Sequence, residues 1–541
     1  MPAKIVECVP NFSEGCDEKI VQAIADAMSN TPGCTVLDVD AGKSTNRTVY
    51  TFVGSPEAVV EGAFNACKVA KELIDMRKHH GEHPRMGACD VCPFIPVQGV
   101  TMDDCVEISK KFAKKAAEEL GIPCYLYEYA SNVAYRKTLP QIRAGEYEHL
   151  AEKIIQPEWK PDFGPAEFVP TWGATVTGAR KFLVAYNVNV LGTKEQAHRL
   201  ALNIRENGRG KDQPGKFKCC KAIGWYVDEY DMAQVSINLT DYEVTGMAEV
   251  YEELCKEAQE LNISICGSQI VGLIPLASMM QVADYYIKKE NLFILEQGQK
   301  LNLAINKLGL HACGHFDPKV HIIEYRVENK LEEPLASLSV RQFIEVLGSR
   351  TAAPGGGSTS ALVAAMGSAL GAMVGWMTYG SKKFESLDSI MRANIAPLHF
   401  IMKDMIPMID EDTNAFNSYM SALKMPKDNE EQIIAREEAM QNGLKHAVHI
   451  PLSSMKKASE AWPFMIEMAK YGNIKSKSDL QVGVRCLEVG IWGCYQNVLI
   501  NLKEIKDESF INTIKEEATL LDENAKKYCE EVLNLLNERD N

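Results

Sequence analysis

The chain has 541 residues, of which 46% are hydrophobic and 24% charged, and its formal net charge at pH 7 is −15. These values are typical of a globular protein with several domains and exclude a disordered or fibrous chain. The acidic balance argues against nucleic-acid binding, which needs a basic surface, but does not exclude a local basic pocket for a small anion.

The cysteines and the N-terminal segment indicate a cytoplasmic protein. The sixteen cysteines are scattered without the regular spacing of a disulfide framework, and the first residues lack the apolar stretch of a signal peptide. Cys89 and Cys92 form a C-x-x-C pair, but no second pair follows at zinc-ribbon spacing. We therefore expect reduced thiols, without a metal or redox role.

Residues 1–181 alternate strand-like and helix-like segments. In chain order we expect a strand at 4–9, a helix at 17–28, strands at 35–39 and 49–53, a helix at 55–76, a strand at 90–95, a helix at 101–121 and a last strand at 124–129. Ser55 followed by Pro56 predicts a capped helix start. Thr101 and Asp104 predict a capping box.

Residues 182–327 repeat this order. We expect a strand at 182–190, a helix from a capping box at 193–196 to about 208, strands at 222–226 and 234–239, a helix capped by Thr240 and Glu243, and a strand at 263–270. Both halves are therefore predicted to be βαββαβ subdomains, 1–181 and 182–327. Two such α/β units side by side form a cleft, which is the usual place for a ligand.

Strand signals end after residue 327. The segment 328–336 is charged and contains Pro334, which is typical of a linker. Residues 337–541 are rich in Met, Ala, Leu, Glu and Lys, and Ser339 with Gln342 forms a capping box, so we predict an all-helical bundle domain. The fold class is therefore α/β followed by all-α.

One segment of the helical part has the composition of a membrane span. No charged residue lies between Arg350 and Lys382, and Gly367, Gly371 and Gly375 recur on one face of the expected helix. Such a face lets another helix approach closely. A helix buried within the bundle explains this pattern as well as a membrane does, and we favour the buried helix.

The densest polar cluster of the first half surrounds His83. His79 and His83 match the H-x-x-E-H pattern of a zinc peptidase, but Gly81 and Pro84 oppose the helix that this pattern needs. The alternatives are an ordinary loop and a loop that presents His83 to the cleft, where an imidazole could transfer a proton.

Two segments of the helical part suggest a second site. The glycine-rich segment 353–358 precedes a helix, where backbone amides suit an anionic or carbonyl group. Asp410 and Asp412 lie about 200° apart on the expected helix, so at most one faces the core. A carboxylate in an apolar pocket would have a raised pKa, whereas the plainer alternative is a solvated first-turn cluster.

Several motifs resemble those of the formimidoyltransferase-cyclodeaminase family. The transferase-like segments are 9–15, 38–40, 44–47, 81–85, 163–165 and 172–180, and the cyclodeaminase-like segments are 353–358, 410–412, 472–473 and 478–479. Together they cover nearly the whole chain in the order of the fused enzyme.

The resemblance implies a first activity at His83. The first domain would transfer the formimino group of N-formimino-L-glutamate, a product of histidine degradation, to N5 of tetrahydrofolate, giving 5-formiminotetrahydrofolate and glutamate. His83 matches the catalytic histidine of the family, and Trp172 would lie against the flat pterin. The matching folate-binding residues are Gly164, Pro165, Ala166, Glu167, Phe168, Val169, Pro170, Thr171, Trp172 and Gly173.

The resemblance implies a second activity at Asp412, which matches the catalytic acid. This domain would form 5,10-methenyltetrahydrofolate and release ammonia. Polyglutamylated tetrahydrofolate is the expected co-substrate, without metal, nicotinamide or pyridoxal phosphate. A homo-oligomer, an octameric ring of dimers packed through the glycine face, is expected, with peripheral Golgi, centrosome or cytoskeleton association in some members. The alternatives are a zinc-dependent hydrolase using His79, Glu82 and His83, and a non-enzymatic scaffold.

Overall fold

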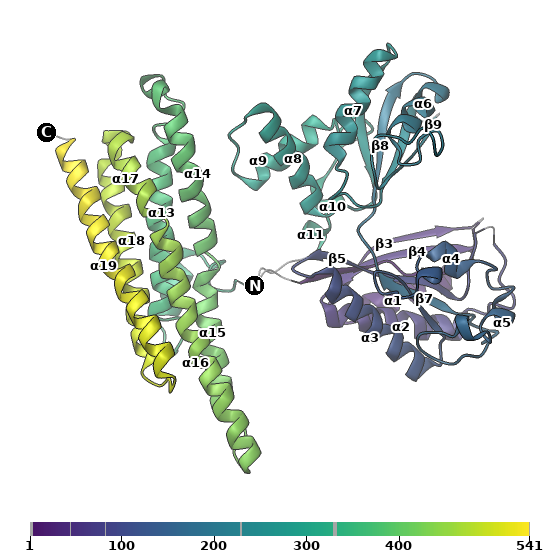
Figure 1. Ribbon diagram of the computed structural model, residues 1–541, viewed down its shortest axis with the longest axis horizontal. Helices are drawn as coiled ribbons and strands as arrows, with labels where there is room; N and C mark the ends of the chain where they lie inside the picture. The colour runs from purple at the N-terminus through teal and green to yellow at the C-terminus, as the bar shows by residue number, and fades with distance from the viewer. Residues whose placement is uncertain (1–3, 44, 82, 228–229, 328–332, 540–541) are drawn as a thin grey trace. The chain divides into compact units, whose positions relative to one another are not determined.

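The computed structural model describes residues 4–43, 45–81, 83–227, 230–327 and 333–539. Apart from Met1, the chain divides into two compact units, residues 2–329 and 330–541. Among the described residues every strand lies in the first unit, and the regular elements of the second unit are all helices (Figure 1). The predicted fold class, α/β followed by all-α, is confirmed.

The first half of the α/β unit is a mixed sheet with its three long helices packed on one face and two short helices against the other (Figure 1). Its elements are β1 (Ile5–Cys8), β2 (Asn11–Phe12), α1 (Glu18–Ser29), β3 (Cys34–Gly42), β4 (Arg47–Gly54), α2 (Pro56–Leu73), β5 (Cys89–Gln98), α3 (Met102–Leu120), β6 (Cys124–Glu128), η1 (Ala134–Arg136), α4 (Leu139–Arg143), α5 (Leu150–Lys153), η2 (Pro157–Trp159) and β7 (Thr175–Ala179). Both β1 and β2 lie between β4 and β5, and β3 pairs with the other edge of β4.

The second half is a four-stranded antiparallel sheet in the order β11-β8-β10-β9. Its elements are β8 (Val184–Leu191), α6 (Lys194–Ile204), β9 (Cys220–Val227), β10 (Met232–Leu239), α7 (Met247–Glu260), β11 (Ser264–Val271), α8 (Leu276–Glu290), α9 (Gln297–Lys307), α10 (Pro318–His321) and α11 (Ile323–Arg326). When β1 and β2 are counted as one interrupted strand, the first strand of each half pairs with the third and fourth, and the second pairs with the third. The βαββαβ pattern is therefore present in both halves.

Two sequence expectations about these sheets are wrong. The strand at 124–129 is not the last of its half, because β7 inserts between β5 and β6 and runs parallel to both. Thr240 does not cap a helix: residues 241–245 form a turn, and α7 begins after Gly246. The Thr240 hydroxyl instead donates to the carbonyl oxygen of Cys219 at 3.2 Å.

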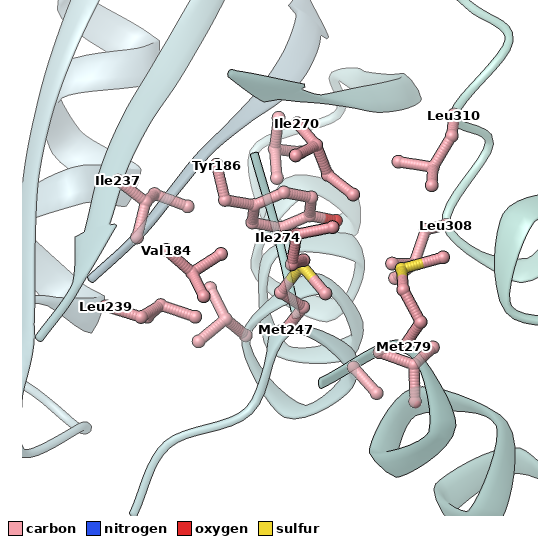
Figure 2. Packing of buried hydrophobic residues seen from close by; sticks show 14 of the residues in the cluster. Val184, Tyr186, Ile237, Leu239, Met247, Ile270, Ile274, Met279, Leu308 and Leu310 are labelled. Carbon is pink, nitrogen blue, oxygen red and sulfur yellow. The ribbon is translucent and has the colours of Figure 1, made fainter. Parts of the chain in front are cut away.

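A shared hydrophobic core holds the two α/β subdomains together. Figure 2 shows Val184, Tyr186, Ile237 and Leu239 of the second sheet packed around Met247 of α7. The same cluster includes residues of the first sheet: Ile5, Leu37, Val53 and Ile95. Burial of apolar area is the main stabilising term in folding. The core therefore fixes one subdomain against the other and holds the walls of the space between them.

The second unit is a bundle of helices. Its elements are α12 (Val340–Leu347), α13 (Gly356–Trp376), η3 (Lys382–Leu387), α14 (Asp388–Met405), α15 (Met408–Leu423), α16 (Glu430–Ser459), α17 (Trp462–Tyr471), η4 (Ile474–Ser476), α18 (Lys477–Leu502) and α19 (Glu508–Glu538). The capping box of Ser339 and Gln342 is formed as predicted. Of the predicted linker, residues 328–332 lie outside the described residues.

Helix α13 is long and apolar enough to cross a membrane by length and composition alone. Its glycine face, however, packs inside the bundle. A Cβ added at Gly367 would lie 2.7 Å from the carbonyl oxygen of Gly483 on α18, and at Gly371 or Gly375 it would meet side chains of α17 and α14. The buried-helix interpretation is confirmed. The expectation that this face packs subunits together is wrong, because the chain's own helices already cover it.

Candidate active sites

A cavity of about 680 Å³ lies between the two α/β subdomains. His83 lines it from the first subdomain, and Lys221 and Thr240 line it from the second. Its cationic lining residues are Arg47, Arg143, Arg180, Lys181 and Lys221, against the two carboxylates of Glu128 and Asp241. This excess of positive charge suits a ligand that carries more than one carboxylate.

The imidazole of His83 is oriented as a proton acceptor. Its Nδ1 lies 2.7 Å from the carbonyl oxygen of Pro84. Because a carbonyl oxygen only accepts, Nδ1 carries the hydrogen and the lone pair is on Nε2. Partial burial and the positive charges of Arg47 and Arg143 lower the pKa of His83. The ring is therefore neutral at pH 7, which a general base requires.

A buried carboxylate fixes two of the cavity's guanidinium groups. Arg47 Nη1 and Arg143 Nη2 each donate to Asp90 Oδ2 at 2.6 Å. The second oxygen of Asp90 accepts the backbone N–H of Met86 at 2.7 Å. The Asp90 side chain is 0% exposed. Sequence reasoning did not assign Asp90 and Arg143 to the site, although a charged residue opening an apolar strand is a usable signal.

The segment around His79 does not form a zinc-peptidase helix. No helix is present between α2 and β5 in the described residues, and Glu82 lies outside them. His79 Nε2 lies 2.7 Å from the carbonyl oxygen of Asn46. Arg85 is held by two hydrogen bonds to the Glu148 carboxylate, at 2.7 and 2.8 Å. His79 and Arg85 therefore brace the loop that carries His83.

None of the predicted folate-binding residues 164–173 is among those that line this cavity. Trp172 is 1% exposed, and its indole N–H donates to the Thr175 hydroxyl at 3.0 Å. The expectation that Trp172 lies against a pterin is therefore wrong for this structure, because core residues cover its ring. Phe168 is half-buried and lies 5.4 Å from the Tyr147 ring. The ring of Phe168 is therefore partly accessible, unlike that of Trp172.

The helical unit contains a second cavity, of about 370 Å³, at the N-terminus of α13. Asp412 of α15 lines it beside Gly356 and Gly357. The Ser358 hydroxyl donates to Asp412 Oδ2 at 3.2 Å. Burial raises the pKa of Asp412, and the hydrogen bond from Ser358 opposes that rise. A carboxyl group of this kind exchanges a proton nearer to neutral pH than an exposed one does.

Asp410 has a different role from Asp412. It is 3% exposed, and its two oxygens accept the backbone N–H groups of Leu335 and Ala336 at 2.8 and 3.0 Å. The end of the predicted linker is thus bound to the first turn of α15. Only Asp412 of the pair faces the cavity, as the helical angle between the two side chains indicates.

Sequence reasoning missed three polar residues that line this cavity from the C-terminal part of α18 and just after it, namely Asn497, Asn501 and Glu504. The hydroxyl of Tyr419, which also lines the cavity, donates to Glu504 Oε2 at 2.8 Å. Asn497 and Asn501 stand one turn apart on α18, which is otherwise largely apolar there. Two amides at i and i+4 on an apolar helix are the signal that was available.

Comparison with known proteins agrees with this division. Models of the formiminotransferase domain match residues 5–180, its N-terminal subdomain, and residues 185–328, and the formiminotransferase-cyclodeaminase model matches residues 339–520. Formimidoyltransferase-cyclodeaminase of Dictyostelium discoideum is 59% identical over 538 residues, and that of Sus scrofa is 53% identical, each covering 99% of both chains. Glutamate formimidoyltransferase of Streptococcus pyogenes serotype M1 is 42% identical and covers 53% of this chain and 95% of its own. The chain therefore belongs to the formimidoyltransferase-cyclodeaminase family.

Proposed function

We propose that the protein is a bifunctional folate enzyme. Its α/β unit transfers the formimino group of N-formimino-L-glutamate to N5 of tetrahydrofolate, and its helical unit cyclises the product to 5,10-methenyltetrahydrofolate with release of ammonia. The observation that carries the proposal is the pairing of two unlike cavities in one chain. One is cationic and holds a neutral histidine, and the other holds a carboxyl group of raised pKa.

In the transferase step, His83 acts as the base. N5 of tetrahydrofolate attacks the amidine carbon, and His83 Nε2 takes the N5 proton. The bond from that carbon to the glutamate nitrogen then breaks, and this nitrogen leaves with a proton returned by the imidazolium. Arg47 and Arg143, held by Asp90, receive carboxylates of the amino acid. The segment 164–173 contacts the folate, with Phe168 as its available ring.

In the cyclodeaminase step, Asp412 moves one proton between two nitrogens. N10 attacks the formimino carbon of the amidinium, and the Asp412 carboxylate takes the N10 proton. The same carboxyl group then protonates the amino nitrogen, the carbon–nitrogen bond breaks, and ammonia leaves. The methenyl product keeps the single positive charge of the amidinium, so protons and charge balance. A raised pKa favours this exchange at neutral pH.

Tethering the two sites raises the effective concentration of the intermediate at the second site. A polyglutamyl tail that stays bound while the pterin moves would retain it further. A cytoplasmic homo-octamer, with peripheral Golgi or centrosome association, completes the proposal and rests on the family resemblance alone. Light scattering of the purified protein tests the octamer, and fractionation of cells tests the location.

Two substitutions test the assignment of the sites. His83→Ala should lower transferase activity by about 10²-fold or more, yet leave cyclodeaminase turnover of supplied 5-formiminotetrahydrofolate intact. Asp412→Ala should do the reverse. Both variants should keep the thermal midpoint of the parent within a few degrees. A variant that loses both activities while it stays folded contradicts the two-site assignment.

A further inference from the structure

Arg143 is the last residue of α4 and lines the transferase cavity. Its Nη2 donates to Asp90, and its Nε is buried without a hydrogen-bond partner among the described residues. Arg47 differs, because its Nε and Nη2 both donate to Asn11 Oδ1, at 3.2 and 2.9 Å. A guanidinium group has five N–H donors. Arg143 is therefore the member of the pair with more donors left for a substrate carboxylate.

The backbone around Arg143 forms the end of a helix, where carbonyl oxygens lack partners within the helix. Lys153 supplies partners for two of them, because its Nζ donates to the carbonyl oxygens of Ile142 and Ala144, at 2.7 Å in each case. These two residues precede and follow Arg143. The carbonyl oxygen of Arg143 itself accepts the N–H of Glu146 at 2.8 Å. Three consecutive carbonyl groups at the arginine are therefore all hydrogen-bonded.

The side chain of Lys153 is itself held in place by its surroundings. It ends α5, and its neighbours Leu150 and Ile154 are 0% exposed and share a core cluster with Ile142. The ammonium group lies 3.8 Å from the centre of the Trp159 ring, within the range of a cation–π contact. Burial lowers the pKa of Lys153 to about 8, so the protonated form still predominates at pH 7. The ammonium is therefore a fixed donor at the end of α4.

We propose that Lys153 is a positioning residue for the transferase reaction, because it fixes the turn that carries Arg143 and so places the guanidinium that receives a carboxylate of the amino-acid substrate. This inference rests on the proposed function and adds a residue that does not itself line the cavity. A charge-assisted hydrogen bond weakens when its donor moves or tilts. Loss of the lysine should therefore weaken substrate binding and leave the proton transfer at His83 intact.

Steady-state transferase kinetics of the full chain test this role. Lys153→Met keeps nearly the length of the side chain and removes its N–H donors. We expect the KM for N-formimino-L-glutamate to rise about tenfold, with kcat and the KM for tetrahydrofolate within about twofold of the parent. Lys153→Arg, which keeps a cation with N–H donors, should hold that KM within about threefold of the parent. A lysine that only stabilised the fold would lower the thermal midpoint and the active fraction without changing this KM.

Two comparisons separate positioning from a general effect. Lys160→Met removes an exposed lysine next to Trp159 and should leave both KM values unchanged. Arg143→Ala should itself raise the KM for N-formimino-L-glutamate. Since Lys153 acts through Arg143, adding Lys153→Met to Arg143→Ala should raise that KM no further, whereas independent effects would multiply. Lys153→Gln, whose side chain is shorter, replaces Lys153→Met in every comparison should the methionine variant not fold.

A KM within about threefold of the parent in Lys153→Met overturns the inference, as does a further rise of more than about threefold in the double variant. Absence of transferase turnover in the parent protein would count against the proposed function instead. Titration of the full chain with L-glutamate then decides the role of Lys153. Binding about tenfold weaker in Lys153→Met than in the parent and in Lys160→Met supports the inference, and equal or undetectable binding overturns it.

Discussion

The position of Asp412 depends on the absence of a side chain at residue 357. A Cβ added at Gly357 would lie 2.0 Å from Asp412 Oδ1, about 1.4 Å short of the 3.4 Å at which ordinary contact begins. In Gly357→Ala the carboxyl group must therefore move by roughly that amount. A misplacement of about 1 Å in a reacting group costs about 10²-fold in rate, or about 2.7 kcal/mol in the barrier.

Cyclodeaminase turnover of supplied 5-formiminotetrahydrofolate measures this effect directly, and transferase activity of the same preparation reports on the rest of the chain. We expect Gly357→Ala to lose about 10²-fold of the first activity and none of the second. Gly356→Ala is the matched control, because its Cβ would meet Asn497 Nδ2 at 3.4 Å, an ordinary contact. Because alanine favours a helix over glycine by up to about 1 kcal/mol, helix propensity alone should not destabilise either variant. Activity of Gly357→Ala within threefold of the parent would refute the reasoning.

Four further outcomes follow from the described contacts. Because the pKa of His83 is lowered from 6.5, the base form predominates at pH 7, and transferase kcat/KM should fall as the pH drops below that lowered pKa; an acid limb centred above 6.5 contradicts this. Trp172→Phe removes the bond to Thr175 and should cost about 1 kcal/mol in urea unfolding without raising the KM for tetrahydrofolate, whereas a raised KM at unchanged stability would restore pterin stacking. Asp90→Asn leaves Arg47 and Arg143 without their counter-charge and should cost about 3–5 kcal/mol, against almost none for the exposed Asp103→Asn. Raising the ionic strength from about 0.05 to 0.5 M shortens the screening length from about 14 to 4 Å, so the KM for N-formimino-L-glutamate should rise several-fold and cyclodeaminase KM less than twofold; equal responses would contradict the charge assignment of the cavities.

Local signals in the sequence predicted most of the fold. Caps and hydrophobic periodicity located the helices that begin after Ser55, Thr101 and Ser339, because both act within a few residues. Strand β7 escaped prediction because its run, Thr175–Ala179, is short and small-sided and is defined by its two parallel neighbours. The predicted helix cap at Thr240 is not formed, because the Thr240 hydroxyl donates instead to the carbonyl oxygen of Cys219. Both β7 and the role of Thr240 therefore depend on contacts between residues that are far apart in the sequence.

The candidate sites divide in the same way. His83 could be singled out because glycine and proline beside it exclude a helix, which leaves a partly exposed imidazole in a loop at the cleft. Arg143 and Asp90 are 53 positions apart, and nothing local to either residue indicates that they meet. The prediction that Trp172 lies against the pterin failed for a related reason. A motif that contains an aromatic residue does not show whether the ring is covered by the protein core or by a ligand. The solvent exposure of the Trp172 side chain depends on the folded structure, and the sequence motif alone did not predict it.

The two cavities differ in charge in a way that matches the substrates of the two steps. The amino-acid substrate of the first step is an anion, and Arg47 and Arg143 suit its carboxylates. The second step binds no free amino acid, and the described residues that line its cavity include no lysine or arginine. The formimino group itself passes through both cavities, so the difference in charge follows the amino acid and not the group that is transferred. The chain that joins the two cavities keeps the intermediate close to the second one.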